Sequence, residues 1–251
     1  MTHEESLAGG NASGSAVVRL DNTVRKPWSA STASVIAFVD ALRSAGVDAP
    51  TLLGRDELGR QVQEFIPGTL AMDSGALSHA DLHRVGAMVR VIHDVSNTYT
   101  PPADAVWETA IPTPAGELVC HNDLAPWNLI IGDRWVFIDW DASAPSTRIW
   151  DLAYAAQAFT LSDTTRDPLE AAGDLAALID GYRADHRIRH LLPDTMIQRT
   201  AAMYDLLRTS HEASEEPWAS MYMAGHGEHW SAAHSYVRSH RDVWLAALAT
   251  A

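Results

Sequence analysis

The chain is poor in cysteine, in lysine and in long apolar runs, and each shortage excludes a class of protein. Its 251 residues include one cysteine, Cys120, so no disulfide framework can form and we expect a cytoplasmic location. No stretch of about 18 apolar residues occurs, so we expect no membrane span. Residues 1–10 lack the basic start and apolar run that are typical of a signal peptide.

Positive charge is also scarce. The chain carries 18 Lys and Arg against 32 Asp and Glu, a formal net charge of −14, and Lys26 is its only lysine. A chain with this charge repels phosphate backbones, so nucleic acid is not an expected partner. Hydrophobic residues make up 47% of the sequence, enough for a buried core at this length.

The first quarter of the chain has the pattern of a small α+β unit. A turn of small residues at 9–14 precedes two strand-like runs, 16–20 and 23–26, whose junction Asp21-Asn22 predicts a hairpin. Apolar residues at helical spacing predict a helix over 31–45. Strand-like runs follow at 51–53 and 61–66, and Pro67-Gly68 ends the second.

The pattern changes after Gly68. Ser78 followed by Asp81 predicts a capped helix, and residues 96–116, rich in Pro and Thr, predict a loop. Residues 117–140 have the pattern of two short strands around a polar loop, with Gly132-Asp133 as a turn. From Trp150 onward the pattern is helical. We therefore expect two lobes, residues 1–68 and residues 69–251.

The polar loop carries the residues typical of phosphoryl transfer. His121, Asp123 and Asn128 have H-x-D-x-x-x-x-N spacing, and Asp139 follows on the next strand. An aspartate such as Asp123 can accept a hydroxyl proton. Asn128 and Asp139 offer the oxygen ligands that Mg²⁺ prefers.

Three segments, "VCHNDLAPWNLI", "VFIDWD" and "RIWDLAYAA", resemble the catalytic loop, metal-binding strand and following helix of the aminoglycoside phosphotransferase family. The resemblance implies an α+β, protein-kinase-like two-lobed fold with a small β-rich N-terminal lobe and a larger, mostly helical C-terminal lobe. It also implies a Mg²⁺-dependent kinase that uses ATP or GTP, with catalytic residues Asp123 and His121 and metal ligands Asn128 and Asp139.

The resemblance also implies a nucleotide site in the first lobe. "VQEFIPG" is similar to the strand that links the lobes, where the backbone of Glu64, Phe65 and Ile66 would meet the adenine. The turn around Gly10 and Ser13 resembles the loop that covers the phosphates.

A cation on the third strand would hold the phosphates, and two candidates adjoin. The position of Pro27 favours Arg25, whereas the apolar Val24 two residues earlier favours Lys26. We slightly favour Arg25. Neighbours on a strand face opposite sides, so only one of the two should reach the nucleotide.

Two departures from protein kinases are visible. Residues 31–45 contain no Glu to pair with this cation, and Asp40 is their only acid. Asp139 is followed by Trp140-Asp141 rather than Phe-Gly, which favours a small-molecule kinase over a regulated protein kinase. Asp151 resembles the family's structural acid but could equally be a helix-start residue. His93 is read as a helix-end residue.

The acceptor is the least determined part of the prediction. Glu212, Glu215, Glu216 and Trp218 could bind an amine or form a solvated loop. We favour an aminoglycoside-like or amino-alcohol acceptor. The alternatives are a kinase of another metabolite, such as choline, homoserine or a sugar, and a non-catalytic nucleotide-binding protein. The sequence does not determine the oligomeric state.

Overall fold

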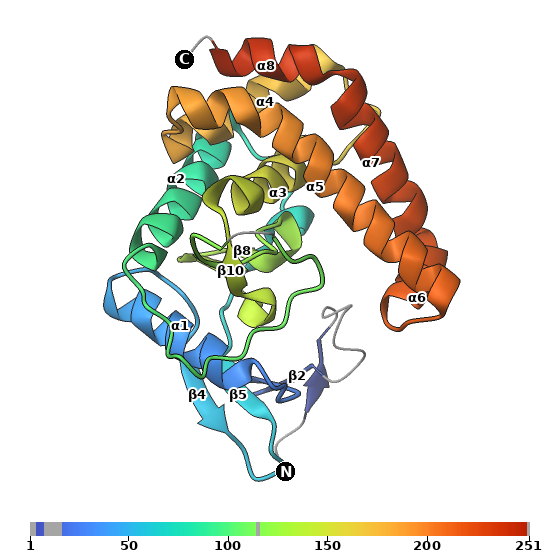
Figure 1. The fold of residues 1–251 in the computed structure, drawn as a ribbon. Coiled ribbons are helices and arrows are strands. Elements are labelled where there is room, and N and C mark those ends of the chain that lie inside the picture. The colour runs from blue at the N-terminus through green and yellow to red at the C-terminus, as the bar shows by residue number, and fades with distance from the viewer. Residues whose placement is uncertain (1–3, 8–16, 114–115, 250–251) are drawn as a thin grey trace.

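The computed structural model describes residues 4–7, 17–113 and 116–249. A small antiparallel sheet with one helix lies at one end of the molecule, and the remaining helices fill the other end (Figure 1). The predicted α+β, protein-kinase-like architecture is confirmed. The predicted lobe boundary at residue 68 stays a prediction, although the five-stranded sheet lies wholly before it.

The N-terminal sheet has the strand order β1-β2-β3-β5-β4. Its strands are β1 (Glu5–Ser6), β2 (Val18–Leu20), β3 (Thr23–Lys26), β4 (Leu52–Arg55) and β5 (Gln61–Glu64). The predicted hairpin over β2 and β3 is confirmed, with Asp21 in the left-handed region at φ 53°. In β3, Val24 and Lys26 are buried while Thr23 and Arg25 are partly exposed. The two candidate cations therefore lie on opposite faces of the strand, and only Lys26 is on the buried face.

Helix α1 (Thr32–Ser44) buries Val35, Phe38, Val39 and Leu42, as its apolar spacing predicts. The side chain of Ser31 does not cap this helix. Its hydroxyl instead donates to the Glu108 carboxylate at 2.9 Å, so an acid from a distant loop lies at the helix start, where the helix dipole favours negative charge.

The larger part of the chain contains two further small sheets. Strands β6 (Thr69–Leu70), β8 (Leu129–Ile131) and β9 (Trp135–Phe137) form one, in the order β6-β8-β9. Strands β7 (Leu118–Cys120) and β10 (Ala144–Ser146) form the other. The β8–β9 hairpin turns at Gly132-Asp133 as predicted, whereas β10 was not predicted.

Seven α-helices are described in this part. They are α2 (His79–Ser96), α3 (Arg148–Thr160), α4 (Pro168–Tyr182), α5 (His186–Ala213), α6 (Trp218–Met221), α7 (Gly227–Ser239) and α8 (Arg241–Ala249). Ser78 and Asp81 form the predicted capping box of α2. Helices α5, α6 and α7 form an arm that extends away from the other helices, with α6 at its tip (Figure 1).

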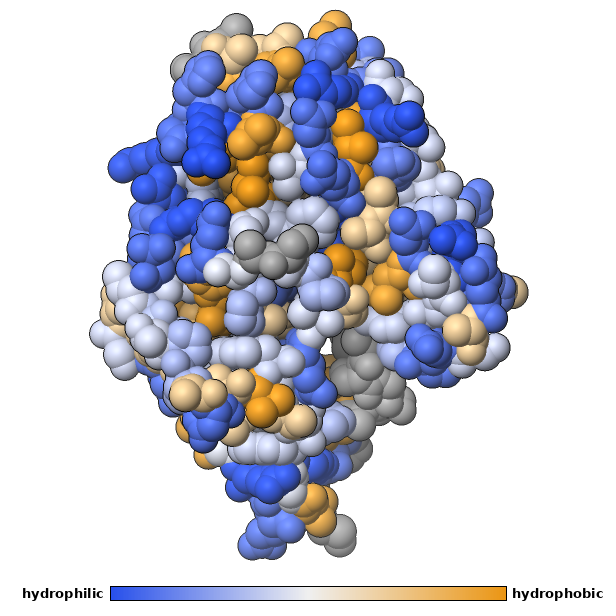
Figure 2. Space-filling view, in the orientation of Figure 1, coloured by the Kyte–Doolittle hydropathy of each residue, from blue (hydrophilic) through white to orange (hydrophobic). Residues whose placement is uncertain are grey.

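The main hydrophobic core joins the helix of the N-terminal lobe to helices of the larger part. Residues of α1 share one buried cluster with residues of α2, α3, α4 and α8. Hydrophilic residues are spread over the outer surface, and apolar residues form small separate groups in the view of Figure 2. No helix within the described ranges has the length and apolar character needed to cross a membrane.

Candidate active site

The loop between β7 and β8 is folded around Asn128. Its side-chain amide donates to the backbone oxygen of Asp123 at 2.9 Å and to the carboxylate oxygen Oδ2 of Asp123 at 2.7 Å. The backbone oxygen of Asn128 accepts from the Ile138 N–H at 2.8 Å. These bonds join the predicted base, Asp123, to the hairpin that carries Asp139.

Asp139 follows β9 in the left-handed region, at φ 59° and ψ 63°. This conformation is unfavourable for a residue other than glycine and is often found at functional sites. The Asp139 carboxylate lies 2.9 Å from the Lys26 ammonium, and the Asp141 carboxylate lies 2.8 Å from the same nitrogen. Lys26 therefore joins the N-terminal sheet to the β9 end of the hairpin.

The geometry places Lys26, and not the slightly favoured Arg25, beside Asp139. Arg25 points to the other side of β3, where its Nε lies 3.4 Å from Asp56 and its guanidinium donates to Thr23. The alternation of β3 buries Lys26 with Val24, which is the apolar pattern that favoured Lys26 in the sequence.

Helix α1 has no glutamate to pair with Lys26, and the carboxylates of Asp139 and Asp141 pair with it instead. Asp40 is exposed on α1. The two carboxylates of Asp139 and Asp141 surround Lys26 and raise its pKa, although burial opposes this shift. Asp141 was not predicted as a site residue, and its position two residues after Asp139 is the only sequence signal that could have indicated it.

His121 is fully buried below the loop rather than facing a cleft. Its Nδ1 accepts from the Asp123 N–H at 3.3 Å, and its Nε2 lies 3.1 Å from the Ile138 oxygen. Burial lowers the pKa of His121, and both contacts suit a neutral ring with its proton on Nε2. These contacts are those of a residue that supports the loop, and the catalytic role of His121 stays a prediction.

Asp151 and His93 form a buried support for the same loop. The Asp151 carboxylate accepts from the Asn122 N–H at 2.8 Å and lies 3.0 Å from His93 Nε2. His93 Nδ1 lies 2.8 Å from the Tyr182 hydroxyl. His93 lies in the last turn of α2, as the sequence predicted, and its ring is also fully buried and links α2, α3 and α4.

The Asp123 carboxyl group has an unusual environment. Burial and the nearby charge of Asp139 raise its pKa to about 7, while hydrogen bonding from Tyr154 and Asn128 and the charge of Arg199 lower it. A carboxyl group with a pKa near neutrality is suited to proton exchange at physiological pH. Arg199, on α5, is a second neighbour that sequence reasoning missed.

The predicted adenine-contacting segment begins at Glu64, the last residue of β5, and continues to Ile66. The Glu64 N–H donates to Thr51 and the Phe65 N–H donates to Asn22, so both amides are used inside the N-terminal lobe. The Glu64 side chain pairs with Arg134 at 2.6 Å, and Ile66 is buried. Gly10 and Ser13, predicted to cover the phosphates, lie outside the described residues.

The predicted acidic acceptor cluster lies at the exposed tip of the arm. Glu212 pairs with Arg208 at 2.9 Å, and Glu216 accepts from the Ser220 hydroxyl at 2.7 Å. Closer to the loop the arm is aromatic. Trp230 of α7 stacks on Tyr154 at 5.9 Å between ring centres, and Trp127 meets Tyr154 edge-on at 6.3 Å.

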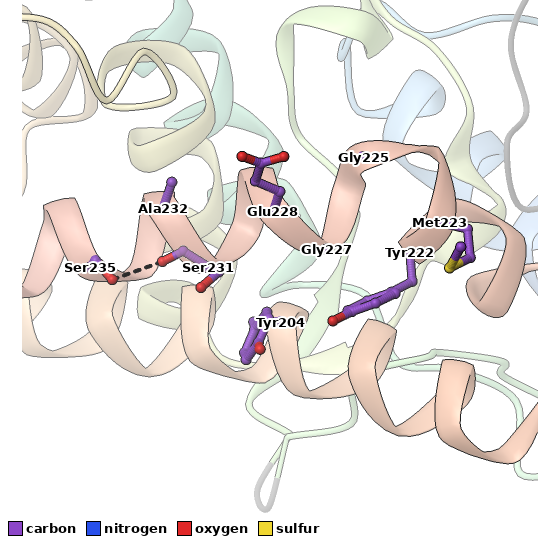
Figure 3. Close-up of a pocket in the computed structure, with 9 residues that line it drawn as sticks. All are labelled: Tyr204, Tyr222, Met223, Gly225, Gly227, Glu228, Ser231, Ala232 and Ser235. Carbon is purple, nitrogen blue, oxygen red and sulfur yellow. Dashed lines mark hydrogen bonds between the residues drawn. The ribbon is translucent and has the colours of Figure 1, made fainter.

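An open groove of about 510 Å³ lies on the arm between α5 and α7. Tyr204, Tyr222, Glu228, Ser231 and Ser235 contribute to its wall (Figure 3). None of the predicted site residues lines this groove. It is therefore a separate surface feature and not the place where Asp123 and Asp139 meet.

Comparison with known proteins agrees with this geometry. The sequence model of the phosphotransferase enzyme family matches residues 102–191, which include His121, Asp123, Asn128, Asp139 and Asp151. The fold and this match make the chain similar to phosphotransferases of protein-kinase-like architecture. They confirm the resemblance to the aminoglycoside phosphotransferase family that the sequence predicted.

Particular relatives extend the likeness over most of the chain. The trifolitoxin immunity protein of Rhizobium leguminosarum bv. trifolii is 28% identical over 235 residues, covering 86% of this chain and 87% of the relative. A microcompartment-associated aminopropanol kinase has a TM-score of 0.68 at 13% identity, covering 97% of this chain and 94% of its own. An amicoumacin kinase, solved with AMP-PNP, Ca²⁺ and its ligand, has a TM-score of 0.66 at 11% identity, covering 95% and 88%. At these identities the two structures show the shared fold.

Proposed function

We propose that this protein transfers the γ-phosphoryl group of ATP or GTP to a hydroxyl group of a small molecule in a Mg²⁺-dependent reaction. The observation that carries the proposal is the convergence of Lys26, Asp123, Asn128 and Asp139 at the junction of the two lobes. These residues come from a strand, a loop and a hairpin that are distant in sequence, and together they supply the groups that phosphoryl transfer requires.

The side chains present fit a divalent cation. Asp139 and Asp141 already direct two carboxylates at one positive charge, the Lys26 ammonium. Asn128 adds a side-chain amide next to Asp123, and its backbone is bonded to Ile138, the residue before Asp139. Carboxylate and amide oxygens are the ligands that Mg²⁺ prefers. Bound there, Mg²⁺ would neutralise negative charge on the phosphates. We assign Asn128 and Asp139 as its ligands, with Asp141 as an additional carboxylate.

The remaining steps belong to the chain's own side chains. Lys26 binds phosphate oxygens of the donor. Asp123 accepts the proton of the acceptor hydroxyl as that oxygen bonds to the γ-phosphorus and the bond to the β-phosphate oxygen breaks. The nucleoside diphosphate leaves. Asn128 orients the Asp123 carboxylate through the hydrogen bond of 2.7 Å that its amide donates.

The test is Asp123→Ala, assayed with Mg²⁺-ATP and Mg²⁺-GTP against a panel of amino alcohols and aminoglycosides. We expect kcat to fall by about 10²-fold or more while nucleotide affinity changes little, since the base acts in the transition state. Asp133→Ala is the control, because Asp133 is exposed at the turn of the neighbouring β8–β9 hairpin. Near-normal kcat for Asp123→Ala with a saturating acceptor contradicts the proposal.

For the acceptor, we propose a hydroxyl compound that carries an amine. The net charge of −14 and the aromatic residues near Asp123 support this choice, because aromatic faces attract cations. The relative named as an immunity protein favours an antibiotic-like acceptor, whereas the aminopropanol kinase favours a small metabolite. Initial rates with one acceptor of each kind at low and high salt separate these possibilities.

A further inference from the structure

Arg199 lies in the middle of α5 and is buried beneath the catalytic loop, with 6% of its surface exposed. Its Nη2 donates to the backbone oxygen of Asn122 at 3.4 Å. Its guanidinium carbon lies 4.2 Å from the ring centre of Tyr154 and 5.7 Å from that of Trp150. Within the described part of the chain, its Nη1 has no hydrogen-bond partner.

Asn122, which immediately precedes Asp123, is held from several directions. Its backbone is in the left-handed region at φ 64°, a conformation that costs free energy for a residue with a side chain. Asp151 accepts from its N–H at 2.8 Å, and its side-chain amide donates to Ala142 at 3.1 Å. Arg199 holds the opposite side of the residue, the carbonyl, which belongs to the peptide that begins Asp123.

Tyr154 is the second point at which Arg199 reaches the surroundings of Asp123. Tyr154 lies close enough to Asp123 that each group shifts the pKa of the other. Its ring contacts the Arg199 guanidinium and also stacks on Trp230, with an angle of 13° between the ring planes. The position of the Tyr154 hydroxyl therefore depends on Arg199 packing against the ring.

Burying a guanidinium with an unpaired N–H costs free energy, and an apolar side chain of similar length would fill the same space without that cost. The two acids near this charge, Asp123 and Asp151, both belong to or support the catalytic loop. A role in packing alone therefore does not account for an arginine here.

We propose that Arg199 is a positioning residue for phosphoryl transfer. It holds the Asn122 carbonyl and the Tyr154 ring, and through them it fixes the orientation of the Asp123 carboxylate. The proposal rests on the function proposed above, since it assumes that Asp123 acts on the acceptor hydroxyl.

The first experiment is independent of any substrate. Hydrogen exchange of the backbone amides is measured by mass spectrometry for wild type, Arg199→Met and the control Arg189→Met. Arg189 lies on the same helix and pairs with Asp180 at 2.7 Å, away from the loop. We expect about tenfold faster exchange in peptides covering residues 119–125 in Arg199→Met alone. Unchanged exchange in these peptides overturns the proposal.

The second experiment separates positioning from simple packing. Mg²⁺-ATP turnover, with water as acceptor, is measured for Arg199→Ala. We expect kcat to fall by about 10²-fold and the KM for ATP to change less than about threefold. Guanidinium chloride at non-denaturing concentration should restore part of kcat, whereas equal sodium chloride should not.

Wild-type kcat in Arg199→Ala, or equal responses to the two salts, overturns the role of Arg199. A wild type that is inactive with water and with every acceptor of the panel counts against the proposed function, and hydrogen exchange still decides the role of Arg199. If the Ala and Met variants do not fold, Arg199→Lys keeps the charge but not the planar stacking. Its kcat should fall about tenfold, and a wild-type kcat there overturns the proposal.

Discussion

At the scale of single residues, Lys26 and Arg25 are neighbours in β3 and face opposite sides of the strand. Which of them would hold the nucleotide phosphates depends on which side of β3 faces the site. The sequence contained the deciding signal, the apolar Val24, but the position of Pro27 outweighed it. The structure directs Lys26 towards Asp139 and Arg25 towards Asp56. Sequence patterns alone could not decide this point, because which face of β3 meets the site depends on how the sheet packs on the second lobe.

We predict that Lys26→Ala raises the KM for the nucleotide about tenfold or more, while Arg25→Ala changes it less than about threefold. The physical reason is that only Lys26 reaches the junction where the phosphates would bind. Steady-state kinetics with ATP checks this, and thermal melts of both variants control for stability. A larger effect of Arg25→Ala would return the role to Arg25.

Asp123 allows a prediction about stability in the metal-free protein. Its pKa is about 7 when folded, against an ordinary value near 4. Between these values the folded protein holds a proton that the unfolded chain has released, so its contribution makes the protein less stable as pH rises from about 4 to 7. Above pH 7 the Asp123 carboxyl group is ionised in both states, and the free energy of unfolding is lowered by the full cost of burying this charge.

Asp123→Asn should therefore stabilise the metal-free protein at pH 8 by about 1–3 kcal/mol, since the amide carries no charge and its oxygen can still accept from Asn128. At pH 4 the difference should nearly vanish. Urea unfolding in EDTA at both pH values provides the measurement. Asp133→Asn, at an exposed site, should show no such pH dependence. A variant destabilised at pH 8 would mean that burial does not penalise the Asp123 carboxylate.

Other residues of the site could not be predicted. Asp123, Asn128 and Asp139 have a recognisable spacing within 17 positions of chain, whereas Arg199 acts across 77 positions, from a helix whose pattern is ordinary. His93 carries no local signal that distinguishes a buried link from a helix-end residue. Contacts of this kind arise from the packing of α2, α3 and α5 around the loop.

At the scale of elements, helices α2 and α4 show what sequence patterns predict and what they leave open. The capping box of α2 was predicted correctly from Ser78 and Asp81. The close approach of α2 to α4 was not predicted, because it depends on glycines within the helices. A Cβ on Gly181 would lie 1.9 Å from the His83 oxygen, and one on Gly86 would lie 1.9 Å from the Leu178 oxygen.

We predict that Gly181→Ala destabilises the protein by more than about 2 kcal/mol, because the new methyl group meets backbone of α2 and the helices must separate. Gly173→Ala in the same helix is the matched control. Its Cβ would lie 3.5 Å from the His79 ring, an ordinary contact, so the gain in helix propensity should leave stability unchanged or raised by up to about 1 kcal/mol. Equal effects in denaturant melts would show that the two helices can move apart at little cost.

At the scale of the whole molecule, the sequence predicted the two-lobed architecture and the order of its main elements. It did not predict that α1 shares one core with the helices of the second lobe. Nor did it predict the interlobe ion pairs in which Arg134, on the β8–β9 hairpin, contacts Asp48 and Glu64. Both features connect distant parts of the chain, and residue spacing contains no information about such contacts.

Because Lys26 comes from one lobe and Asn128 and Asp139 from the other, a nucleotide bound with Mg²⁺ should stabilise the whole molecule. At 100 times its Kd such a ligand adds about 2.7 kcal/mol, which corresponds to a rise in Tm of about 5–10 °C for a chain of this size. ATP analogues that are not hydrolysed, with Mg²⁺ or EDTA, separate the metal-dependent part of the shift.

Asp139→Asn should remove most of that part, because it deletes a carboxylate ligand and weakens the contact with Lys26. Asp133→Asn, on the same hairpin but exposed, should keep the full shift. An undiminished Mg²⁺-dependent shift in Asp139→Asn would place the metal elsewhere, and no shift in the wild type would count against nucleotide binding itself.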